Sequence, residues 1–154
     1  MISATHLHAM IIHFPIALLV VGFISELIAI FIKNDFFKNA AFYLLLLGAL
    51  GAIVAYVTGS YAGEGIEEGP LLIPMELHEQ AALITLWLAI ITALYRVLIH
   101  YFKVQNVTAK WVGILLYVFL AVAVGRTGYL GGQLVFSHGA GVELALPDFN
   151  NLQN

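Results

Sequence analysis

The chain is 154 residues long, with 62% hydrophobic and only 10% charged residues. A soluble domain carries about 25% charged and about 45–50% apolar residues, so this composition excludes an ordinary soluble protein. The formal net charge is −3, and six Lys and Arg residues are too few to form a nucleic-acid-binding surface. The absence of cysteine excludes disulfides, thiolate metal sites and thiol nucleophiles, and leaves six histidines as the plentiful metal ligands.

Four stretches of the sequence are long and apolar enough to cross a membrane, because a helical span needs roughly 20 mostly apolar residues. These stretches lie at 10–32, 40–61, 77–101 and 111–136. The connections between them are short and polar, and short connections make successive helices antiparallel neighbours. We therefore expect one transmembrane domain over residues 1–154, an all-α integral membrane four-helix up-down bundle followed by a tail at 137–154.

The positive charges lie beside two of the three connections. Those that flank the first and third connections are Lys33, Lys38, Arg96, Lys103 and Lys110. The N-terminus, the second connection and the C-terminal tail contain no Lys or Arg. Cytoplasmic loops carry the excess of positive charge, so the sequence predicts a bacterial inner-membrane protein with both termini in the periplasm.

Five of the six histidines fall on the predicted periplasmic side. Counted along the helical rise, His13 and His78 lie at similar depth in the first and third spans. His8 and His138 lie at similar depth nearer the water, and His6 is farther out. An imidazole at this depth is costly without a partner, so these histidines are functional candidates, although an interfacial histidine often only hydrogen-bonds a carbonyl or a lipid headgroup.

Two histidines from facing helices at matching depth are the arrangement that holds a b-type haem in a bundle. We expect His13 and His78 to be the axial ligands of one haem. His8 and His138 then hold a second haem or shape the mouth of the site. Methionine is the alternative axial ligand, and the two methionines near the cluster are Met10 and Met75.

Small residues predict room for such a group beside the fourth span. At positions that share one face, this span carries Ala121, Gly125, Gly128 and Gly132. The second span carries an equivalent set at Gly48, Ala52, Ala55 and Gly59. Close helix packing is the commoner use of such a stripe, and the two uses are compatible, since both exploit missing side chains.

Two charged residues lie inside the predicted spans. Arg126 is close to the middle of the fourth span, and Glu26 is in the cytoplasmic half of the first, with an axial offset of about 11 Å. A direct ion pair requires both side chains to stretch. The alternatives are that Arg126 binds a haem propionate or another anion, and that Glu26 is a hydrogen-bonded neutral acid or takes part in proton movement.

Three segments of the sequence resemble a known family. They are His8-Ala9-Met10-Ile11-Ile12-His13-Phe14-Pro15 at the start of the first span, His78 at the start of the third, and Gly131 to Gly139, which reads GGQLVFSHG, at the end of the fourth. Over about residues 5–142 the chain is similar to the four-helix bacterial membrane proteins of domain-of-unknown-function family 2231. Relatives occur beside, or fused to, Rieske and cytochrome-type redox domains, so the resemblance implies a redox role with redox partner proteins.

No hydrolase or phosphate-binding motif is present in the sequence. An electron carrier needs no catalytic acid or base. We therefore expect a membrane-bound b-type haem protein that carries electrons near the periplasmic face, as a subunit of a respiratory or photosynthetic complex rather than a stand-alone enzyme. The competing hypotheses are a copper or zinc site among these histidines, chiefly His6, His8 and His138, and a purely structural subunit.

The distribution of cations predicts the topology. A reporter fused after Asn154 should read as periplasmic, and one inserted after Gln105 should read as cytoplasmic, because the positive charges retain the first and third connections inside. Paired alkaline phosphatase and fluorescent-protein fusions measure this. The opposite pattern would contradict a periplasmic position for the histidines.

Overall fold

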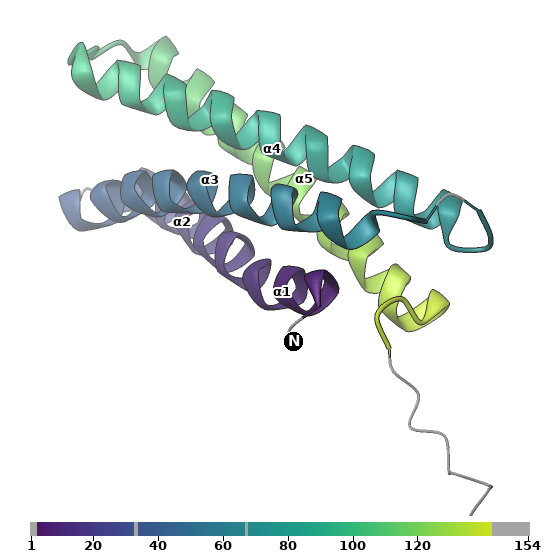
Figure 1. Cartoon of the computed structure of the whole chain (residues 1–154). Coiled ribbons are helices and arrows are strands. Elements are labelled where there is room, and N and C mark those ends of the chain that lie inside the picture. Colours follow the sequence, from purple (N-terminus) through teal and green to yellow (C-terminus); the bar gives the residue numbers. More distant parts are fainter. Residues whose placement is uncertain (1–2, 33, 67, 143–154) are drawn as a thin grey trace, which may run out of the picture.

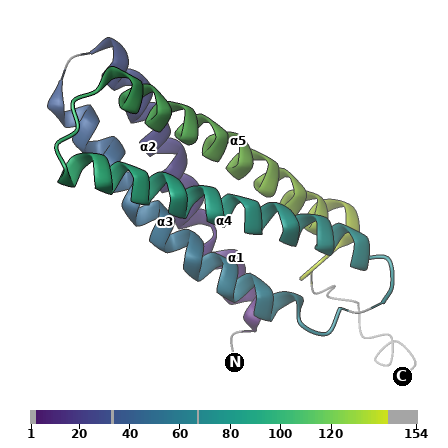
Figure 2. The same ribbon diagram turned by 90° about the horizontal axis from the view of Figure 1, so that it is seen from above.

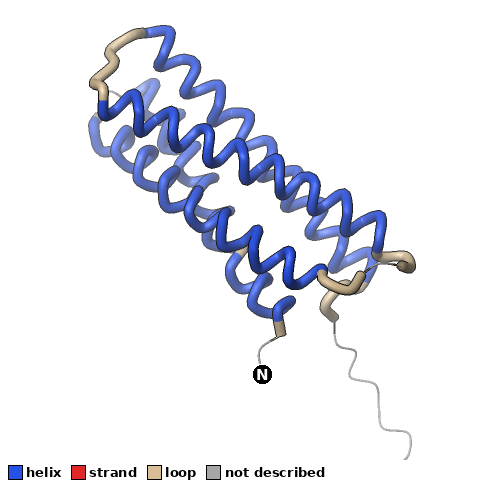
Figure 3. Tube along the Cα trace, turned by 45° about the horizontal axis from the view of Figure 1, so that its top comes forward, coloured by secondary structure: helices blue, strands red, loops and turns tan. Residues whose placement is uncertain are grey.

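The computed structural model describes residues 3–32, 34–66 and 68–142, and this part of the chain contains helices and loops but no strand (Figures 1 and 3). The helices are α1 (Ala4–Ile11), α2 (His13–Phe31), α3 (Asp35–Gly63), α4 (Leu72–Tyr101) and α5 (Val107–His138). Within the described residues, four helical segments are long and apolar enough to cross a membrane, with α1 and α2 together forming the first. The predicted all-α four-helix membrane bundle is confirmed. Most of the predicted tail, residues 143–154, lies outside the described residues.

Polar caps end the helices beyond the apolar stretches, so the helices are longer than the predicted spans. The Asn34 side chain accepts a hydrogen bond from the Phe36 amide at the start of α3. Asn106 caps the start of α5 in the same way, through the Thr108 amide. Gly139 ends α5 in the left-handed conformation at φ 66°, which glycine adopts without strain.

A break at Ile12 divides the first crossing into α1 and α2. Pro15 follows within one turn, and it has no amide hydrogen to donate to the carbonyl four residues earlier, which kinks or breaks a helix. The Pro15 ring packs on α3 at Gly51, where a Cβ would lie 3.2 Å from the Pro15 Cβ. On the N-terminal side of this break, α1 packs on α3.

Two tightly packed helix pairs, α2 with α3 and α4 with α5, make up the bundle (Figure 1). The pairs join through α3 against α4 and through α2 against α5. α1 packs on α3 and α2 but not against α4 or α5. α1 lies beside α3 (Figure 2), and the turn after α5 reaches α1, where a Cβ at Gly141 would lie 2.8 Å from Thr5 Cγ2.

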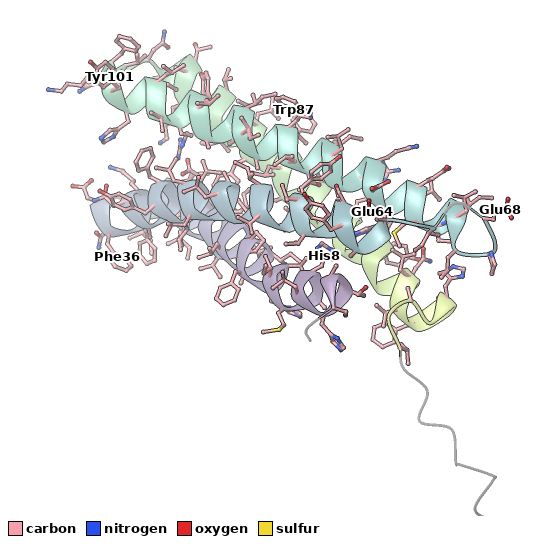
Figure 4. The ribbon with its side chains drawn as sticks, viewed as in Figure 1. His8, Phe36, Glu64, Glu68, Trp87 and Tyr101 are labelled. Carbon is pink, nitrogen blue, oxygen red and sulfur yellow. The ribbon has the colours of Figure 1, made fainter. Side chains whose placement is uncertain are left out.

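The bundle has two distinct ends. We call the end that holds the N-terminus, the α3–α4 connection and the end of α5 the histidine end. The opposite end, with Lys38, Lys103 and Lys110, is the lysine end. Figure 4 shows His8, Glu64 and Glu68 toward the first of these ends and Phe36 and Tyr101 at the second.

The interior combines many small residues with a few large side chains such as Leu19 and Tyr117, and many other large apolar side chains face outward. The buried residues of α4 are alanines and threonines only: Ala81, Thr85, Ala89, Thr92 and Ala93. Gly48 on α3 receives the Leu19 side chain, since a Cβ there would lie 2.7 Å from Leu19 Cγ. Small residues let membrane helices approach closely. The resulting van der Waals packing holds the helices together, because lipid provides no hydrophobic driving force between them.

The buried carboxylate in the first crossing pairs with an arginine that the sequence analysis had placed with the loop cations. Arg96 of α4 donates a hydrogen bond to Glu26 of α2, and their side chains are only 16% and 6% exposed. The sequence analysis had considered Arg126 as the partner of Glu26, but Arg126 is exposed on α5. α2 and α4 run in the same direction, because each is antiparallel to α3. Glu26, near the end of α2, and Arg96, near the end of α4, therefore lie at one level toward the lysine end.

Replacing Glu26 by Ala should destabilise the fold, because the buried Arg96 guanidinium loses its counter-charge. We expect the free energy of unfolding to fall by about 3–5 kcal/mol. The double variant Glu26→Met with Arg96→Met should lose less, since no charge is then left unpaired. Unfolding of the detergent-solubilised protein, followed by circular dichroism, measures both.

The exposed pair between Lys38 and Asp35, with Nζ and Oδ1 3.0 Å apart, is the matched control for this measurement. Lys38→Ala should leave stability almost unchanged, because exposed ion pairs contribute little. A Glu26→Ala variant as stable as Lys38→Ala would contradict a structural role for the buried pair.

Candidate functional site

His8 extends from α1 toward α3. Its Nδ1 lies 3.2 Å from the Thr58 Oγ1 atom. The single hydroxyl proton of Thr58 is donated to its own helix, where the Val54 and Ala55 carbonyl oxygens lie at 3.0 Å. With its proton donated to the helix, the Thr58 oxygen accepts from His8 in the tautomer that carries the proton on Nδ1, and this tautomer leaves the Nε2 lone pair free.

Gly59 allows this close approach of His8 to α3. A Cβ at Gly59 would lie 2.9 Å from Cε1 of the imidazole and within 3.4 Å of both ring nitrogens. Such a distance is not tolerated between real atoms, so the ring would have to move. Thr58 and Gly59 together form a seat for the His8 ring on α3.

His78, near the start of α4, has a similar seat on α5. A Cβ at Gly131 would lie 3.0 Å from Cε1 of the His78 ring. The backbone of Thr127 lies beside the same ring. The Nδ1 atom of His78 is buried and has no hydrogen-bond partner. A buried polar nitrogen without a partner is costly, so this atom is available to bind a ligand.

The two imidazoles are close enough for their charges to interact. They come from helices that do not pack on each other, since α1 contacts α2 and α3 while α4 contacts α3 and α5. His8 and His78 thus approach each other across the histidine end rather than along a helix–helix seam. The structure thus places His8 within range of a charge interaction with His78, whereas the sequence analysis had paired His78 with His13 and His8 with His138.

The remaining candidate ligands lie elsewhere at this end. His13 is exposed at the start of α2, directly after the kink, and His138 is exposed as the last residue of α5. His6 is exposed and lies 3.0 Å from the Ser3 hydroxyl. Met10 is 62% exposed, and Met75 lies near Gly63 rather than at a histidine. In the described part of the chain, no group of three or more His, Cys, Asp or Glu side chains is placed to hold a metal ion.

The glycines of the fourth span face unfilled space. Positions Gly125, Gly128 and Gly132 would each accept a Cβ with no atom within 4 Å. Gly128 follows Tyr117 by about three helical turns, so both lie on one face of α5. At Tyr117 this face packs against α2, where the ring centroid of Phe23 lies 5.6 Å away. At Gly128 it is open, because α1 does not pack against α5.

Arg126 points away from that open face. Two residues along a helix correspond to about 200° of rotation, so Arg126 and Gly128 lie on nearly opposite sides of α5. Arg126 borders a hollow between α4 and α5, with Leu88 and Phe119. The structure therefore separates the predicted haem-binding glycines from the predicted propionate-binding arginine.

A second hollow, of about 300 Å³, opens between α3 and α4 next to the histidines. Ser60 and Tyr61, which follow Gly59, line one side, and Glu79, which follows His78, lines the other. Water and polar groups therefore have access to the edge of the site at the histidine end.

Sequence reasoning missed three residues that hold the histidines: Thr58, Gly59 and Gly131. Gly59 belongs to the small-residue stripe of the second span, and Gly131 begins the motif that ends the fourth, so both carried a signal for close approach. No signal in the sequence marked Thr58. Its role follows from a contact between residues 50 positions apart.

Comparison with known proteins agrees with this architecture. No curated protein and no solved structure matches the chain. One family model, described as a predicted membrane protein (DUF2231), matches residues 4–144, which include both histidine seats and all five helices. The chain is therefore a member of the DUF2231 family of predicted membrane proteins.

Proposed function

We propose that this protein is a membrane-bound b-type haem protein that carries electrons at its histidine end, with His8 and His78 as the axial ligands. The observation that carries the proposal is the meeting of two seated imidazoles from helices that do not pack on each other. Bundle interiors are where side chains of facing helices bind such cofactors. Haem, when bound, supplies one-electron redox chemistry.

The chemistry of both imidazoles fits this assignment. Thr58 holds the proton of His8 on Nδ1, so that the neutral ring offers Nε2 to a metal. Histidine ligands ordinarily donate their other ring N–H to a fixed acceptor, which sets tautomer and ring orientation. His78 contributes a buried nitrogen whose lone pair or proton has no other partner. The His8 ring meets this requirement, and the His78 ring offers a buried nitrogen without a hydrogen-bond partner.

The open face of α5 supplies the space that a flat macrocycle needs. Gly128 and Gly132 offer no side chain on the side of α5 that α1 leaves uncovered. The turn after α5 closes this region at the histidine end, where a Cβ at Gly141 would lie 2.8 Å from Thr5 Cγ2. Apolar surroundings of this kind exclude water and tune the potential of a haem.

The proposed location follows from the charge distribution. Lys38, Lys103 and Lys110 lie at the opposite end from the histidines, so the positive-inside rule assigns the histidine end to the periplasmic face of the bacterial inner membrane. Electron exchange there requires a redox partner protein or a neighbouring subunit of a redox complex. The protein itself supplies binding and orientation of the haem rather than acid–base catalysis.

Substituting His8 or His78 by Ala should abolish the haem absorption of the purified protein, because each supplies one axial ligand. The protein is expressed with a haem supply and purified in detergent, and the Soret band, the reduced-minus-oxidised spectrum and metal content are measured. His13→Ala and His100→Ala are the controls and should retain the full spectrum. His100 is distant, since it stacks on Phe42 with ring centroids 5.0 Å apart.

Each contrary result has a definite meaning. Loss of the spectrum in His13→Ala but not in His8→Ala would restore the pairing expected from the sequence. A wild-type protein that binds copper or zinc but has no Soret band would replace haem with a metal site. A wild-type protein with neither would leave the structural-subunit hypothesis.

The Thr58→Val variant tests the orientation of His8 without changing side-chain shape. Loss of the hydroxyl removes the acceptor for the Nδ1 proton, and such outer-shell changes typically lower affinity by about 10–100-fold. Haem titration of the apoprotein measures the dissociation constant. Thr58→Ser keeps the hydroxyl and should bind haem as the wild type does; equal affinity of the Val and wild-type proteins would exclude this role.

A further inference from the structure

Arg126 is a cation in the hydrocarbon region that has no counter-charge among the described residues. It lies about 5 Å from the middle of α5, counted by the helical rise, and its side chain is exposed on the outer surface of the bundle. No hydrogen bond or ion pair to Arg126 forms among the described residues. Charged residues at this depth ordinarily face a protein interior or a partner.

A hollow of about 240 Å³ lies beside this arginine, between α4 and α5. Its lining is otherwise apolar: Ala81, Ile84 and Leu88 come from α4, and Phe119, Val122 and Ala123 come from α5. A lipid chain could fill the hollow but would not neutralise the guanidinium. An occupant that fits both the apolar lining and the guanidinium must be apolar along its length and carry a negative charge at the depth of Arg126.

A second copy of this chain does not meet that requirement. A two-fold contact through this face would bring one Arg126 against the other, because an isologous interface presents the same patch twice. Glu26 is the acidic residue nearest the middle of the described spans, and it is buried against Arg96. Glu79 lies on the α3–α4 side, in the other hollow.

We propose that the α4–α5 face around Arg126 is the docking surface for a transmembrane helix of another protein that carries a carboxylate at the level of Arg126. The guanidinium fork matches a carboxylate with two parallel hydrogen bonds, which a desolvated site strengthens. Apolar side chains on the partner helix fill the hollow on either side of the ion pair. This surface is separate from the histidine seats, so the proposal does not depend on bound haem.

A peptide probe tests the charge requirement directly. The full-length protein is labelled with a donor fluorophore and reconstituted into phosphatidylcholine vesicles at pH 8. Two labelled poly-leucine transmembrane peptides are compared, one with a central Glu and one with Gln at the same position. We expect energy transfer to the Glu peptide at concentrations at least about tenfold below those that the Gln peptide needs, because a hydrogen bond to a charged group changes affinity by about tenfold or more.

Variants of the protein identify the surface. Arg126→Gln should abolish the preference for the Glu peptide, and Arg126→Lys should keep part of it. Lys110→Gln, which removes a cation at the lysine end, should change nothing. Circular dichroism of Arg126→Gln checks that the exposed substitution leaves the helices intact.

Three results would overturn the proposal. The first is equal association of the Glu and Gln peptides with the wild type. The second is an unchanged preference in Arg126→Gln. The third is self-association of the wild-type protein, counted by single-molecule photobleaching, that Arg126→Gln abolishes, because it would assign this face to a second copy.

Discussion

The absence of water from the bilayer interior is the constraint on which this structure depends, because every polar group there must find its partner inside the protein. The helices satisfy the backbone. Among the described residues, three hydrogen bonds between side chains then link different helices: Glu26 with Arg96, His8 with Thr58, and the Thr85 hydroxyl 2.8 Å from that of Thr127. Since lipid provides no hydrophobic drive between helices, such contacts decide which helices lie side by side.

Glycine is the second determinant of the arrangement, because it receives bulky groups from neighbouring helices. Gly48 accepts Leu19 and Gly51 accepts Pro15, which brings α2 against α3. The same device seats imidazoles, with His8 on Gly59 and His78 on Gly131. Glycines therefore serve both helix packing and the candidate site. On α3, Gly48 and Gly51 receive residues of α2, and Gly59 receives the His8 ring.

The packing of α1 connects the fold to the proposed function. α1 packs on α3 and α2 but not on α5, which leaves one side of α5 uncovered near the histidine end. One side of α5 then faces the space beside the histidines, and the other carries Arg126 toward the outer surface. In the proposed arrangement a single helix borders the haem on one side and a partner protein on the other.

The sequence by itself determined the class of fold, because hydropathy and span length depend only on local composition, and it also identified the histidines as candidates and the family. It did not determine which histidines meet, since helical depth alone cannot show the direction of a side chain or a kink at Ile12. Depth favoured His13 with His78, whereas His8 shares its helical face with the buried Pro15 and Leu19 and contacts Thr58 of α3. Likewise Arg96 was assigned to the loop cations from its position near the end of a span. Only the packing of α2 and of α4 against α5 made it the partner of Glu26, because partners in a bundle are set by contacts between residues far apart in the chain.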